Sequence, residues 1–198
     1  MINTTRLRCT IGWLGMLLPW IVALLLWDIP SSISATYYNP RTIAPFMIIM
    51  GGATFLLISY KGYDLQDDII NSLAGLCGLV LCLFPCYADL PLVGTFQLQP
   101  NLSNTIHTYA AILFFIFLAY NSFFLFTKTS GNMTANKKKR NVIYRVCGAG
   151  MICSFLIMLL PYFRIQIWLT ETIALFFFAI SFLTKADYYK WLFADEKN

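Results

Sequence analysis

His107 is the only histidine in the chain, and it is the side chain best suited to act as a general base near neutral pH. A base that removes the proton of a serine hydroxyl turns that serine into a nucleophile for carbonyl carbons. The candidate nucleophiles are Ser31, Ser32 and Ser34, and the carboxylates that could orient the imidazole are Asp28, Asp89 and Glu171. The residue types therefore allow a hydrolase, with His107, Ser34 and Glu171 among its candidate catalytic residues. No G-x-S-x-G, H-E-x-x-H or phosphate-loop motif accompanies them.

The composition indicates where such chemistry would take place. Of 198 residues, 59% are hydrophobic and only 12% are charged, whereas soluble domains carry roughly 25% charged residues. A soluble domain of this length could not bury so much apolar surface, so we expect an integral membrane protein. The six cysteines lack zinc-type spacing and form no evident disulfide framework. We therefore expect no metal site and no cofactor.

Six apolar windows approach the length of about 20 residues that a membrane-spanning helix needs. They cover roughly 11–27, 42–60, 70–86, 107–127, 142–161 and 166–184. The sequence thus predicts an all-α bundle of six transmembrane helices, which forms a single membrane domain over residues 1–198. Ala74 and Gly78 place small residues one turn apart, which favours close helix packing within the bundle or in a homo-oligomer.

Lys and Arg residues are distributed unequally between the two sides of this predicted bundle. Twelve of the fourteen fall on the side of the N-terminus, and only Arg41 and Arg164 fall on the other. Because cytoplasmic loops are enriched in Lys and Arg, we expect both termini to be cytoplasmic and the protein to lie in the cell membrane. The basic segment 128–141 is interpreted as an inner linker. Its KKKR run favours contact with anionic membrane lipids, and no nucleic-acid partner is expected.

An acidic cluster lies in the inner turn before the third window, with Asp64, Asp67 and Asp68 close to Lys61. The spacing does not match a calcium-binding loop. Two interpretations stay open, a solvated turn with a local ion pair and a cation or regulatory site.

Polar residues gather at the outer ends of the predicted helices. Because unpartnered polar groups at membrane depth are costly, they are candidates for function. The candidate ligand-binding residues are Asp28, Ser31, Ser34, Tyr38, His107, Arg164 and Glu171. The segment PSSISATYY at 30–38 is interpreted either as the cap of an outward-facing polar pocket or as an interfacial anchor made by its tyrosines.

Short motifs carry a resemblance to a known family. They are P-S-x-I-S-A-x-Y-Y at 30–38, Y-K-G-Y-D at 60–64, N-x-x-A-G at 71–75, His107, and R-N-x-x-Y-R-x-C-G at 140–148. Together they resemble a family of uncharacterised bacterial six-helix membrane proteins, similar in layout to the DRAM/Sfk/PGAP-type proteins associated with lipid remodelling and lipid asymmetry. The resemblance implies a six-helix bundle with an outer polar site. The chain departs from the family pattern at Thr42, where an acidic residue would follow the arginine.

Three functional hypotheses follow from these observations. The leading one is a protein without enzymatic activity whose outward-facing polar pocket binds lipid head groups or a small ligand. The second is an oligomeric ion channel or membrane-permeabilising effector, since six helices could line a pore. The third is a membrane-embedded hydrolase that uses His107.

Overall fold

The structure is a computed structural model that describes residues 4–129, 131–158 and 167–188. Its described part is all-helical, as the sequence predicts, and holds six α-helices and no β-strand. The helices are α1 (Thr4–Leu26), α2 (Ile43–Ile58), α3 (Leu65–Leu83), α4 (Pro100–Tyr120), α5 (Ala135–Met158) and α6 (Ile167–Lys185). A 3-10 turn, η1 (Ser34–Tyr38), precedes α2, and a π-helical turn, η2 (Asn121–Leu125), continues α4.

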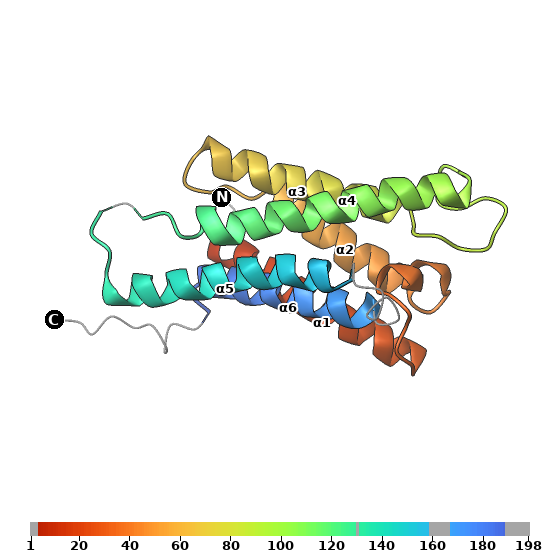
Figure 1. The fold of residues 1–198 in the computed structure, drawn as a ribbon, viewed down its shortest axis with the longest axis horizontal. Coiled ribbons are helices and arrows are strands. Elements are labelled where there is room, and N and C mark those ends of the chain that lie inside the picture. Colours follow the sequence, from red (N-terminus) through yellow and green to blue (C-terminus); the bar gives the residue numbers. More distant parts are fainter. Residues whose placement is uncertain (1–3, 130, 159–166, 189–198) are drawn as a thin grey trace.

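The helices run up and down beside one another in one elongated bundle (Figure 1). Each helix packs against the next in sequence, and α6 closes the ring against α1. These two helices are antiparallel, because Arg8 near the start of α1 reaches the Lys185 carbonyl at the end of α6, and Trp20 meets Trp168 at their other ends. All odd-numbered helices therefore begin at the same end of the bundle.

Within the described residues, five helices are long and apolar enough to cross a bilayer, namely α1, α3, α4 with η2, α5 and α6. A membrane location fits this pattern. Helix α2 has 16 residues and is about 24 Å long, less than the ~30 Å hydrocarbon core. The sixth crossing and the cytoplasmic placement of the termini stay predictions.

Three helices begin seven residues before the apolar windows that predicted them. They start at Thr4, Pro100 and Ala135 rather than at 11, 107 and 142. Apolar windows mark contact with lipid, whereas a helix continues into polar residues as long as its backbone bonds are made. Pro100 suits the first helical turn, and lysine and arginine are good helix formers. The second half of the expected linker 128–141 is therefore the start of α5, and a helix places its basic side chains on fixed faces.

Small residues bring α3 against α2. A side chain at Gly75 would meet Ile58 and the Thr54 carbonyl, and one at Gly78 would collide with the Thr54 side chain. The stripe of small residues predicted on the third helix is therefore a packing seam within the bundle. This seam sets the distance between α2 and α3.

Candidate functional sites at the two ends of the bundle

The bundle has two polar ends. The serine-loop end carries residues 27–42, the segment between α3 and α4, and the start of α6. The basic end carries the start of α1, the turn 59–64, η2, the start of α5 and the end of α6. Figure 1 shows them at opposite ends of its long axis.

At the serine-loop end, hydrogen bonds fasten the chain on both sides of η1. The Trp168 amide donates to the Ser31 carbonyl at 3.1 Å, and the Ile33 amide donates to Glu171 Oε2 at 2.6 Å. On the far side, the Tyr38 hydroxyl donates to the Cys86 carbonyl at 2.5 Å. Burial, with Cys86 and Tyr37 nearby, raises the pKa of Tyr38 to about 12, so this hydroxyl stays a donor. The loop is thereby held against α6 and the segment after α3.

His107 joins the loop to the end of α3. Its Nδ1 lies 2.8 Å from the Phe84 carbonyl oxygen, and its Nε2 lies 3.1 Å from Ser34 Oγ. The side chain is 7% exposed. Of the three candidate serines, Ser34 is thus the one that meets the imidazole, while Ser32 Oγ accepts from the Ala35 amide. The expectation that a carboxylate orients His107 is wrong in this arrangement, because a backbone carbonyl takes that position.

The other predicted ligand-binding residues have separate places. Asp28 is exposed and accepts from the Ile29 amide at 2.7 Å. Arg164 lies outside the described residues. The structure therefore brings Ser34 and His107 into direct contact, and it ties Ser31, Tyr38 and Glu171 to the same loop through backbone groups.

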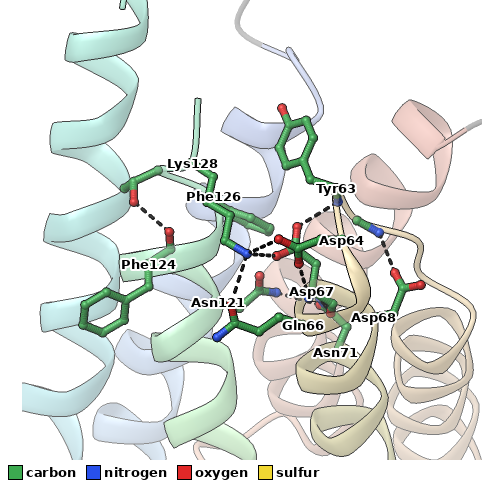
Figure 2. A network of polar contacts seen from close by, with 12 residues as sticks. Tyr63, Asp64, Gln66, Asp67, Asp68, Asn71, Asn121, Phe124, Phe126 and Lys128 are labelled. Atoms are coloured by element: carbon green, nitrogen blue, oxygen red, sulfur yellow. Dashed lines mark hydrogen bonds and ion pairs between the residues drawn. The ribbon is translucent and has the colours of Figure 1, made fainter. Parts of the chain in front are cut away.

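At the basic end, the acidic cluster forms a bonded turn at the start of α3 (Figure 2). Asp64 is the N-cap, since its Oδ1 accepts from the Asp67 amide at 3.1 Å. Asp67 accepts from the Tyr63 amide, and Asp68 accepts from the Gly62 amide and from Lys61. No group of three metal-ligating side chains occurs within the described ranges. The local ion pair expected from the sequence is confirmed, between Lys61 and Asp68 at 3.0 Å.

Lys128 connects this turn to the segment after η2 (Figure 2). Its Nζ lies 2.8 Å from Asp64 Oδ2 and 2.9 Å from Asp67 Oδ1. The hydrogen bond from Lys128, followed by that from the Asp67 amide, lowers the pKa of Asp64. The Asp64 carboxylate is therefore ionised at neutral pH, and Lys128 pairs with both Asp64 and Asp67.

Two buried amides extend the same network inward. Asn121 Nδ2 donates to Asn71 Oδ1 at 2.6 Å, and Asn71 Nδ2 donates to the Asp67 carbonyl at 2.7 Å. Asn121 is the first residue of η2, so the π-helical turn places its amide against α3 (Figure 2). The network positions the chain that leads from α4 toward Lys128.

A cavity of about 220 Å³ opens beside these residues. Among the residues that the structure describes, five cationic side chains line it with a single carboxylate. The lining residues are Arg8, Tyr63, Lys128, Thr129, Lys137, Arg140, Tyr144, Lys185 and Asp187. This lining, which we call the basic cavity, is drawn from α1, the turn before α3, the segment after η2, α5 and α6.

The cations of the basic cavity differ in their partners. Arg140 pairs with Asp187, yet its Nε is buried and has no hydrogen-bond partner among the described residues. Lys137 Nζ and Lys185 Nζ both donate to the carbonyl oxygen of Phe126, at 2.9 and 3.4 Å. Lys185 also lies over the rings of Tyr63 and Phe126, at 4.5 and 5.1 Å from their centroids.

Arg8 completes the positive side of the cavity. Its Nε donates to the Tyr60 hydroxyl at 3.1 Å, and its guanidinium carbon lies 5.3 Å from the centre of that ring. In the described part of the chain, Arg8, Lys137 and Lys185 therefore rest on carbonyls, a hydroxyl and aromatic faces rather than on carboxylates. The cavity holds positive charge that these contacts leave largely uncompensated.

Sequence reasoning missed the basic cavity, although part of its signal was present. Lys137, Arg140 and Tyr144 are spaced by three and four residues, which places them on one face once α5 begins at Ala135. Arg8 and Lys185 come from the two ends of the chain, and no local pattern links them.

Comparisons with protein-family models, with curated proteins and with solved structures gave no match. The resemblance to the bacterial six-helix family stays a prediction from the motifs.

Proposed function

We propose that this integral membrane protein binds an anionic group, the phosphate of a lipid head group or of a small ligand, in the basic cavity. The observation that carries the proposal is the convergence of two ammonium groups, those of Lys137 and Lys185, on one carbonyl oxygen. Like charges brought together away from bulk water repel each other, and a bound anion would offset that repulsion. The Nε of Arg140, which has no partner within the described ranges, supplies a further donor.

The location supports a lipid as the source of the anion. Lys185 ends α6, and Lys137 lies in the first turn of α5, so both stand where two apolar helices reach the membrane boundary. Phosphate groups of lipids lie at that depth. We propose further that the basic end faces the cytoplasm, since most Lys and Arg residues lie there and the cytoplasmic leaflet is negatively charged.

The proposed site lies at the opposite end from the outward-facing pocket favoured by the sequence. That pocket, the ion channel and the homo-oligomer stay predictions. Native mass spectrometry would read the subunit number, and ion flux from liposomes would test a pore.

The chain contains its own control for the proposed site. Lys138 and Lys139 lie beside Lys137 in sequence, yet they are exposed and do not line the cavity. The double variants Lys137→Gln/Lys185→Gln and Lys138→Gln/Lys139→Gln remove the same charge. Only the first removes it from the cavity.

The experiment titrates the full-length protein in neutral detergent with phosphatidylglycerol, phosphatidylcholine or glycerol phosphate, and measures affinity by thermal shift. Detergent is used because vesicles would also attract Lys138 and Lys139. Each lysine is expected to contribute about 1 kcal/mol to the free energy of binding. The cavity variant should therefore lose about 30-fold in affinity for phosphatidylglycerol, and the control variant should keep its affinity. Equal losses in both variants would contradict the proposal. Binding of glycerol phosphate as tight as that of phosphatidylglycerol would assign the site to a small anion rather than to a lipid.

A further inference from the structure

At the serine-loop end, the hydrogen bonds of His107 fix where its proton lies. A carbonyl oxygen only accepts hydrogen bonds, so the 2.8 Å contact with Phe84 requires a hydrogen on Nδ1. In the neutral imidazole, Nε2 then carries the lone pair. Ser34 Oγ lies 3.1 Å from that nitrogen, within reach for its hydroxyl to donate. This is the arrangement in which a histidine activates a serine.

The exposure of the two side chains suits this role. His107 is buried, whereas Ser34 is half-buried and in part accessible. A molecule at the surface could therefore reach the serine oxygen while protein surrounds the base. Bonds from Trp168 to Ser31 and from Ile33 to Glu171 hold the chain just before Ser34, so the pair is fixed in place.

The depth of the pair indicates the class of substrate. Helix α4 with η2 covers 26 residues, about 39 Å, against a hydrocarbon core of ~30 Å. His107 lies seven residues from the helix start, about 10 Å along the axis and near the boundary of the acyl chains. Exposed Trp27, Tyr87 and Phe96 at the same end are typical of a membrane interface. The ester carbonyls of lipids lie at this boundary.

We propose that Ser34 is a nucleophile and His107 its general base, acting on a carboxylic ester of a lipid or similar amphiphile. The serine Oγ forms a bond to the ester carbonyl carbon, and its proton moves to Nε2. The bond from that carbon to the alcohol oxygen breaks, and the alcohol leaves with the proton from Nε2. Water then attacks the acyl-serine by the same proton route, which releases the carboxylic acid and restores both side chains.

The proposal is tested on the full-length protein in detergent with a fluorophosphonate probe, and labelled sites are identified by peptide mass spectrometry. Ser34 should be labelled, and Ser34→Ala should abolish the label. Ser59→Ala is the control, because Ser59 is an exposed serine at the opposite, basic end of the bundle. It should leave labelling unchanged.

His107→Gln tests the base. It should slow labelling of Ser34 by about 100-fold or more, and circular dichroism of the variant shows whether the bundle is intact. The rate in the unaltered protein should also fall as pH decreases through the pKa of the imidazole. An unlabelled Ser34 in the unaltered protein, or a rate that is independent of pH, would overturn the proposal.

Two esters of p-nitrophenol test the substrate class, a soluble butyrate and a long-chain palmitate in micelles. The long acyl chain of the palmitate can bind away from the ester group, and such remote contacts raise the rate of the chemical step. The palmitate should therefore be hydrolysed at least ~10-fold faster than the butyrate. Equal rates would overturn the assignment to amphiphiles. Anion binding in the basic cavity involves none of these residues, so the two proposals fail independently.

Discussion

The two ends of the bundle use polar side chains in different ways. At the serine-loop end, His107, Tyr38 and Glu171 each bond a specific atom of the loop chain or of the segment after α3. At the basic end, cations outnumber the carboxylates that line one cavity. Polar residues that gather at the ends of an apolar bundle can thus do so for two distinct reasons. One set fixes the chain and the position of protons, while the other leaves a charge that an external ion can balance.

The difference follows from the range of the forces. A neutral hydrogen bond is directional and acts over about 3 Å, so it is satisfied by one partner. Charge acts over longer distances, especially near a low-dielectric membrane, so several cations act together on one ligand. Four experiments test this difference between the two ends of the bundle.

The largest effect is expected for Asp67→Ala at the basic end. Asp67 is 3% exposed and accepts from Lys128 and from the Tyr63 amide. Lys128 is 30% exposed and keeps Asp64 as a partner, so the cost comes from losing one ion pair together with the bond from the Tyr63 amide, about 3 kcal/mol in all, which reversible unfolding in mixed micelles would measure. The control is Asp68→Ala, which loses the bonds from the exposed Lys61 and from the Gly62 amide at the surface and should cost less. An Asp67→Ala protein of normal stability would show that this turn does not depend on its charges.

His107→Ala should have the next largest effect on stability. It leaves the half-buried Phe84 carbonyl without its donor, at a cost of about 2 kcal/mol of stability. Protease cleavage within residues 27–42 should increase, while anion affinity at the basic end should not change. Ser103→Ala is the control on the same helix, because it removes one bond to the Pro85 carbonyl. A loss of anion affinity in His107→Ala would mean that the two ends are coupled.

Tyr38→Phe removes the hydroxyl that donates to the Cys86 carbonyl, and it should lower the free energy of unfolding by about 1 kcal/mol. The pKa of Tyr38 is raised to about 12 from 10.0. The hydroxyl therefore contributes fully below pH 10, and its contribution is lost as the pH rises toward 12. The difference in stability between the two proteins, measured from pH 8 to 12, should follow this course. A difference that disappears by pH 9 would contradict the hydrogen bond.

The smallest effect is expected for Lys61→Ala. The Lys61 side chain is 80% exposed, and exposed ion pairs contribute less than about 1 kcal/mol. The free energy of unfolding should decrease by about 0.3 kcal/mol at low salt and by less at high salt. Anion affinity should be unaltered, because Lys61 does not line the cavity. A clear loss of affinity would show that total charge, rather than the cavity, determines binding.

The sequence predicted the helices better than it predicted the sites. Apolar windows identify helices because a bilayer requires long apolar segments, but they do not show where backbone bonding ends, so the starts of α1, α4 and α5 were placed too late. The pairing of His107 with a serine was predictable from residue types. The choice of Ser34 and the role of the Phe84 carbonyl were not, because a backbone oxygen has no sequence signature. The basic cavity depends on residues from the two ends of the chain that only the fold brings together.

The short helix α2 has a consequence for the surrounding lipid. Its 16 residues reach about 24 Å, and Ile48 and Phe55 lie exposed along it. The crossing by α2 stays a prediction; as a sixth span it would require a bilayer with a core of ~30 Å to thin beside it or tilt its lipids, at a cost of a fraction of a kcal/mol per Å. The protein should therefore partition toward thinner membranes. Lipids beside α2 would be compressed next to η1, so ester groups would sit deeper there than elsewhere, at the level of Ser34.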